Sequence, residues 1–174
     1  MSSLNFTNIL TQTVDELSES TSYKGLIRQH TDGNPLPSGA MLCEIVELAR
    51  AILFPGYFGN ATLNSRTINY HIGVNVERLM ELLTQQILAG LCSVEENSNQ
   101  AYGEELRLKA ANLSAQFIAQ LPQIRKLLAT DVEAAYNGDP AATSYGEVIS
   151  CYPAIKAISN YRIAHQLRQL GVPL

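Results

Sequence analysis

Apolar residues recur at spacings of three and four along most of the chain, which is the period of an amphipathic α-helix. The first such stretch predicts a short helix whose apolar face carries Phe6, Leu10, Val14 and Leu17. A second helix is predicted over residues 40–53 and is stopped by Pro55-Gly56, within an aromatic and glycine-rich packed turn. A longer helix is predicted over residues 67–90, with Gly90 in the usual C-terminal glycine position. Its broad apolar stripe predicts packing on two sides.

Prolines divide the predicted helices in the second half of the chain. One helix begins near Glu104 and is interrupted at Pro122. A proline in the first turn of a helix sacrifices no hydrogen bond, so a separate helix is predicted from Pro122 to Asn137-Gly138. Polar segments predict one loop at residues 30–39, between the first two helices, and another at residues 93–103, after the longer helix.

The last segment carries explicit start and stop signals. Ser144 and Glu147 have the spacing of a capping box, in which each side chain satisfies a free backbone N–H of the other. Pro153 either kinks this helix or starts a new one, and Gly171 and Pro173 end the final helix. No strand pattern and no six-residue aliphatic repeat is present, so we expect an all-α domain of six to eight helices.

Composition fits a folded domain and excludes some functions. The chain has 174 residues, of which 46% are hydrophobic, so a sizeable core is expected. Twelve Lys and Arg against 16 Asp and Glu give a net charge of −4, which disfavours nucleic acid and anionic membranes as partners. The amino terminus has no targeting pattern, and no stretch reaches the roughly 18 apolar residues of a spanning helix. We expect a cytoplasmic protein.

The cysteines and histidines show no catalytic or metal-binding pattern. Cys43, Cys92 and Cys151 lie dozens of residues apart, so reduced and buried thiols are expected. The three histidines are scattered, and neither a nucleophile elbow nor a phosphate-binding glycine loop is present. We therefore expect no metal site, no bound cofactor and no complete catalytic site in these residues.

Asp139 is the one residue that the local sequence singles out. It follows Asn137-Gly138 at a junction between helices, and Pro140 disfavours helical geometry at the preceding residue. The side chain either caps the next turn through a backbone N–H two residues on, or binds a ligand ammonium as a positioned carboxylate. Local chemistry leaves both alternatives open.

Residues 131–174 resemble the serine O-acetyltransferase family. Three motifs occur in the order and at the spacing that the family shows, and G-V-P-L follows at residues 171–174. The motifs are D-P-A-A at residues 139–142, E-V-I-S-C-Y-P at residues 147–153 and Y-R-I-A-H-Q-L at residues 161–167. F-P-G-Y at residues 54–57 and the stretch 76–90 are similar to the longer amino-terminal arm of some members.

The resemblance implies an enzyme that transfers the acetyl group of acetyl-coenzyme A to the hydroxyl of L-serine in cysteine biosynthesis. Such enzymes have an amino-terminal helical domain followed by a left-handed parallel β-helix. Residues 1–174 would be the helical domain alone, with residues 1–39 as a variable helical arm and loop and residues 104–174 as the family-matching core. The family's general base lies on the β-helix, so no catalytic residue is assigned here and the chain alone is expected to be inactive.

The resemblance also implies a substrate role and partners. Asp139 matches the aspartate of the D-P-A motif, which helps to hold serine through its ammonium. His165 and Arg162 match a helical motif and are expected to be structural. The family forms hexamers from two trimers joined by helical domains, and its carboxy-terminal tail binds cysteine synthase. The alternative hypothesis is a stand-alone, non-catalytic helical interaction module.

Overall fold

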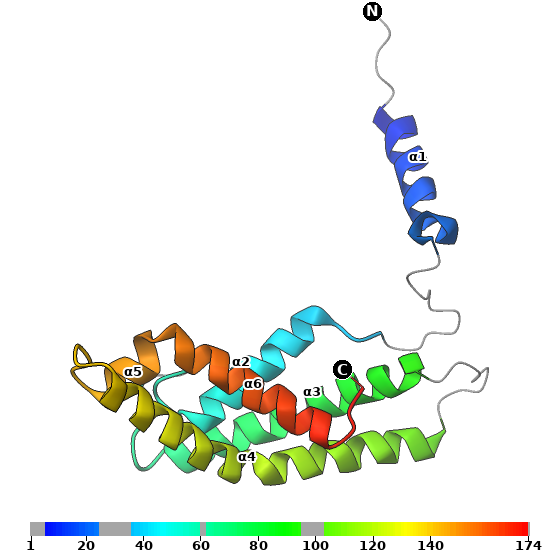
Figure 1. Ribbon diagram of the computed structural model, residues 1–174. Helices are drawn as coiled ribbons and strands as arrows, with labels where there is room; N and C mark the ends of the chain where they lie inside the picture. Colours follow the sequence, from blue (N-terminus) through cyan, green and yellow to red (C-terminus); the bar gives the residue numbers. More distant parts are fainter. Residues whose placement is uncertain (1–5, 25–35, 60–61, 95–102, 174) are drawn as a thin grey trace, which may run out of the picture. The chain divides into compact units, whose positions relative to one another are not determined.

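The computed structural model describes residues 6–24, 36–59, 62–94 and 103–173 (Figure 1). The chain forms two compact units, Met1–Asn34 and Pro35–Leu174. The first contains helix α1 (Phe6–Ser18) and the short 3-10 helix η1 (Ser20–Tyr23). The predicted first helix is confirmed, but none of its residues is buried. Its apolar side chains are 47–72% exposed, namely Phe6, Ile9, Leu10, Val14 and Leu17.

The described part of the second unit contains five helices, all of which pack around one core (Figure 1). They are α2 (Gly39–Leu53), α3 (Ile68–Val94), α4 (Glu104–Gly138), α5 (Tyr145–Cys151) and α6 (Pro153–Gln169). In the described residues the only β-pairing is an isolated bridge between Pro55 and Phe58. The all-α class and the expected number of helices are therefore confirmed.

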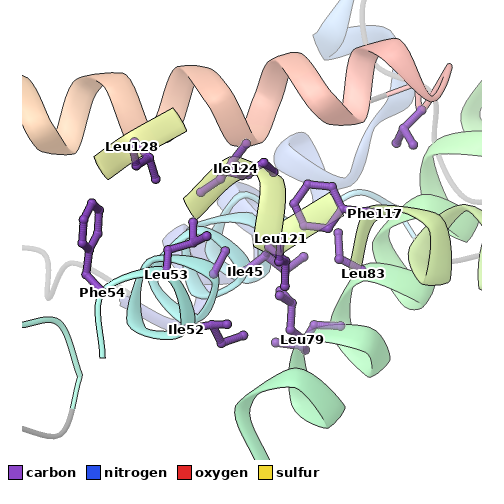
Figure 2. Close-up of a cluster of buried hydrophobic side chains, with 14 of the residues drawn as sticks. Ile45, Ile52, Leu53, Phe54, Leu79, Leu83, Phe117, Leu121, Ile124 and Leu128 are labelled. Carbon is purple, nitrogen blue, oxygen red and sulfur yellow. The ribbon is translucent and has the colours of Figure 1, made fainter. Parts of the chain in front are cut away.

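Apolar faces of α2, α3 and α4 meet to form the core. α3 packs against α2 and against α4, which confirms the two-sided packing that its broad stripe predicted. Figure 2 shows Ile45 and Leu53 of α2, Leu83 of α3 and Phe117 of α4 within one cluster of buried side chains. Phe117 and Leu83 are fully buried, so these contacts fix the three helices relative to one another. α5 packs on α4, and α6 packs on α4 and α2.

Gly90 does not end α3, contrary to the prediction. The helix continues to Val94, and Gly90 lies buried inside it. Leu91 and Cys92, the next two residues after the glycine, are each 8% exposed. Burial of these side chains outweighs the roughly 1 kcal/mol by which glycine disfavours a helix interior.

Pro122 does not begin a new helix, which is a second correction. Residues 104–138 form one continuous helix of 35 residues with Pro122 inside it. Pro122 itself is exposed, whereas Leu121 and Ile124 on either side are buried in the core. Packing on both sides of the proline therefore offsets the roughly 3 kcal/mol that an interior proline costs a helix.

Pro153 begins a new helix, which decides between the two alternatives that the sequence left open. It occupies the first position of α6, and Gly171, with φ of 75°, follows the end of that helix as predicted. The expectation of buried thiols is correct only for Cys92, because Cys43 and Cys151 are exposed. Most of the two predicted loops falls outside the described residues, although Ser38 caps α2 and Ser93 lies in α3.

A buried arginine fixes α6 against α2. Arg50 of α2 is 2% exposed, and its Nε donates to the Ser159 hydroxyl of α6 at 3.2 Å. Its other nitrogens donate to Glu47 Oε1 at 2.6 Å and to the Asn160 side-chain oxygen. The guanidinium also lies over the Phe58 ring, 5.4 Å from the ring centroid. The charge is thus fully partnered, as a buried charge must be.

Candidate functional site

Asp139 lies where α4 ends and the chain turns toward α5. It is the C-cap residue of α4 and has extended geometry, with φ of −116° and ψ of 105°. Pro140 explains this conformation, because the proline ring disfavours helical geometry at the residue before it. The extended backbone that the sequence predicted at Asp139 is confirmed.

Both carboxylate oxygens of Asp139 accept a hydrogen bond. Oδ1 accepts from the backbone N–H of Ala141 at 2.9 Å, which is the predicted cap on the following turn. Oδ2 accepts from the hydroxyl of Tyr152 at 2.6 Å. The tyrosine bond, followed by the Ala141 bond, lowers the pKa of Asp139 below its ordinary value. The side chain is therefore ionised at neutral pH, and its orientation is fixed from two sides.

Tyr152 was not identified as a partner from the sequence. It lies at the break between α5 and α6, with φ of −79° and ψ of 120°, immediately before Pro153. The bond to Asp139, together with desolvation and the nearby negative charge, raises the pKa of Tyr152 to about 12. The phenol is consequently a neutral donor at physiological pH. The sequence signal that could have identified Tyr152 is that it directly precedes a proline, as Asp139 does.

Glu147 adds a second carboxylate near Asp139. The Ser144 hydroxyl accepts from the N–H of Glu147 at 3.2 Å, which confirms one half of the predicted capping box. Glu147 Oε2 accepts from both the hydroxyl and the N–H of Thr143, at 2.6 and 2.8 Å. These bonds lower the pKa of Glu147, although the charge of Asp139 raises it slightly. The junction between α4 and α5 thus holds two ionised carboxylates.

No cation in the described part of the chain forms an ion pair with this junction. Among the described residues, the arginine ion pairs involve Glu44, Glu47, Glu81 and Asp131, and none reaches Asp139 or Glu147. Each Asp139 oxygen retains a second lone pair for another donor. The arrangement can therefore bind a cation such as an ammonium group. In the described ranges, no group of three His, Cys, Asp or Glu residues is placed to hold a metal ion.

Arg162 and His165 lie on α6 and take no part in the junction. Arg162 forms a two-point ion pair with Asp131 of α4, with Nε–Oδ2 and Nη2–Oδ1 distances of 2.6 Å each. His165 is exposed and stacks on Tyr161, with the ring centroids 5.5 Å apart. His71 lies on α3 and forms an edge contact with Tyr70, and His30 lies outside the described residues. No described helix is both long and apolar enough to cross a membrane.

Comparison with known proteins identifies relatives for this helical chain. No family model matches it. A "Serine acetyltransferase, plasmid" of Synechococcus elongatus is 42% identical over 142 residues, covering 80% of this chain and 44% of the relative. A serine acetyltransferase of Mycobacterium tuberculosis is 48% identical over 44 residues, covering 25% of this chain and 19% of the relative.

Solved structures give the same result for the fold. Serine acetyltransferase isoform 3 of Entamoeba histolytica, in complex with cysteine, matches with a TM-score of 0.57 and 27% identity. That match covers 95% of this chain and 52% of the other. Serine acetyltransferase 1 of the same organism, in complex with L-cysteine, matches with a TM-score of 0.57 and 26% identity over 91% of this chain and 50% of the other. The chain spans about half the length of these relatives. In sequence and in fold, the chain is therefore similar to serine acetyltransferases, over a part that makes up about half of their length.

Proposed function

We propose that this chain is the amino-terminal helical part of a serine O-acetyltransferase. The enzyme would transfer the acetyl group of acetyl-coenzyme A to the hydroxyl of L-serine and release O-acetyl-L-serine and coenzyme A for cysteine biosynthesis. The 42% identity over 142 residues to a serine acetyltransferase carries the proposal. In this enzyme the helical part contributes a substrate contact and surfaces for assembly.

Asp139 binds the ammonium group of serine in this proposal. Its carboxylate is ionised, half-buried, fixed by two hydrogen bonds and without an ion-pair partner in the described residues. The two Entamoeba histolytica enzymes were solved with cysteine bound. Cysteine and serine share the ammonium and the carboxylate and differ only in the side-chain sulfur or oxygen. The same aspartate would therefore hold either amino acid, which gives cysteine a route to inhibit the enzyme.

The general base of the reaction lies outside the described residues in this proposal. A serine hydroxyl is a weak nucleophile at neutral pH, so a histidine must remove its proton as it attacks the thioester. His165 is exposed and stacked on a tyrosine, which suits a surface role better than proton transfer. Acetyl-coenzyme A is the co-substrate, and its binding surface also belongs to the catalytic part of the enzyme. The 174 residues alone are inactive.

Assembly, partners and location complete the proposal. The helical parts pair to join two trimers into a hexamer, which would cover exposed apolar side chains such as those of α1. Cysteine synthase binds a carboxy-terminal tail outside these residues, and the enzyme is cytoplasmic. The net charge of −4 supports an absence of nucleic acid and membrane partners.

A stand-alone helical interaction module is the second candidate. The observation that favours it is α1, an amphipathic helix of 13 residues with no buried side chain. A helix this short is marginal in water unless another surface covers its apolar face. Such a module would bind a partner protein and carry out no chemistry.

The decisive experiment is an assay of the protein encoded by the complete reading frame. Release of the coenzyme A thiol is measured with acetyl-coenzyme A in the presence and absence of L-serine. We expect thiol release that depends on L-serine from the complete protein and none from the 174-residue chain. A complete protein that releases no thiol in response to L-serine would contradict the enzyme and favour the interaction module.

A further inference from the structure

Two prolines bring the side chains of Asp139 and Tyr152 together. Pro140 follows Asp139 and Pro153 follows Tyr152, and both preceding residues have extended backbones. Thirteen residues separate the pair in sequence, yet the tyrosine hydroxyl lies 2.6 Å from Oδ2 of the aspartate. The end of α4 and the break between α5 and α6 therefore meet at this bond.

The phenol of Tyr152 is held in place independently of Asp139. Its ring packs against the hydrophobic core of the second unit, and its backbone N–H donates to the Val148 carbonyl at 3.3 Å. Val148 is fully buried, so the C-terminal end of α5 is anchored to the core. The tyrosine is therefore a fixed donor, whereas the aspartate belongs to a surface turn.

The hydroxyl of Tyr152 acts only on Oδ2, because the Ala141 N–H holds the other oxygen. Without the phenol bond, the carboxylate would be held at one oxygen and could rotate about its terminal torsion, which is intrinsically broad. With both hydrogen bonds in place, the carboxylate lone pairs that remain free point in one fixed direction. A ligand ammonium then meets a carboxylate that needs no reordering, which improves affinity.

We propose that Tyr152 is a positioning residue for serine, which fixes the Asp139 carboxylate in the orientation that receives the substrate ammonium. This inference rests on the proposed function of Asp139. Tyr152 does not touch the substrate, so its contribution passes entirely through the aspartate. It therefore affects the binding of serine and leaves acetyl-coenzyme A binding unchanged.

The test is Tyr152→Phe in the complete enzyme, which removes one oxygen atom and keeps the ring in the core. We expect the KM for L-serine to rise about three- to tenfold, with the KM for acetyl-coenzyme A and kcat unchanged. Tyr161→Phe is the matched control, because Tyr161 is 58% exposed on α6 and stacks on His165. A second readout is the pKa of Asp139, measured by carboxyl NMR, which should rise toward its ordinary value in Tyr152→Phe.

A double-mutant cycle separates this inference from the proposed function. Asp139→Asn alone should raise the KM for serine more than Tyr152→Phe does, and the double variant should be no worse than Asp139→Asn. Two results would reject the role of Tyr152 and leave that of Asp139 standing. One is additive effects of the two substitutions on the serine KM. The other is an unchanged serine KM in Tyr152→Phe beside a raised one in Asp139→Asn. An unchanged serine KM in Asp139→Asn would reject the substrate role of Asp139, and the role of Tyr152 with it. A Tyr152→Phe variant that raises both KM values equally would show a general structural defect and also overturn the inference.

Discussion

At the scale of single residues, local chemistry predicts Asp139 but not its tyrosine partner. The aspartate, the proline after it and the next backbone N–H lie within three residues, so the extended backbone and the cap follow from sequence. The Tyr152 bond spans 13 residues and depends on where α5 and its break place the phenol. No local sequence pattern predicts this hydrogen bond, although a proline follows each of the two residues.

Arg162 shows the same limit and gives a prediction about stability. The sequence indicated only a structural role for Arg162, and the structure pairs it with Asp131 across α4 and α6, both side chains being 22% exposed. Arg162→Gln leaves the aspartate charge partly buried without its cation, so we expect a loss of about 1–3 kcal/mol in the free energy of unfolding. Urea unfolding of the chain measures this loss.

Arg78→Gln is the matched control for that experiment. Arg78 also contacts carboxylates, at Glu44 and Glu81, but its side chain is 45% exposed. Solvent screens such exposed pairs, so the urea midpoint of this variant should stay close to that of the parent chain. Equal destabilisation by the two substitutions would mean that the Arg162 pair gains nothing from its partial burial.

At the scale of elements, the period of apolar residues located the helices, but proline and glycine were poor guides to their ends. Pro122 and Pro153 have the same local signal, and only the second begins a helix. What distinguishes them is the residue before each proline, because the backbone of Tyr152 is extended whereas Leu121 continues the helix. Gly90 does not end its helix because it is buried in the core, and burial is a tertiary property that the local sequence does not show.

Pro122 gives a prediction of its own, because it interrupts the hydrogen bonds of a continuous helix. Pro122→Ala restores one backbone N–H within α4 and adds no side chain to the core, since the position is exposed. We expect the free energy of unfolding to increase by about 1–3 kcal/mol. Pro153→Ala at the first position of α6 is the control and should change it by less than about 1 kcal/mol. Destabilisation by Pro122→Ala would show that α4 needs the geometry that the proline imposes.

At the scale of the whole molecule, the sequence predicts the all-α class but not every residue of the candidate site around Asp139. Helical period along the chain predicted an all-α protein, and the structure confirms it with six α-helices among the described residues. The D-P-A-A motif pointed to Asp139 through a family resemblance, and relatives that are serine acetyltransferases support that resemblance. The exposed face of α1 was not predicted, because a periodic pattern shows which face is apolar but not what covers it.

The central claim is that Asp139 holds the ammonium of serine, and the most direct test is the serine KM of Asp139→Asn in the complete enzyme. The substitution keeps the size of the side chain and removes its charge, so the KM for L-serine should rise about 10- to 100-fold while that for acetyl-coenzyme A is unchanged. Glu77→Gln, at an exposed carboxylate on α3, is the matched control and should leave both constants unchanged. A serine KM in Asp139→Asn equal to that of the control would contradict the account.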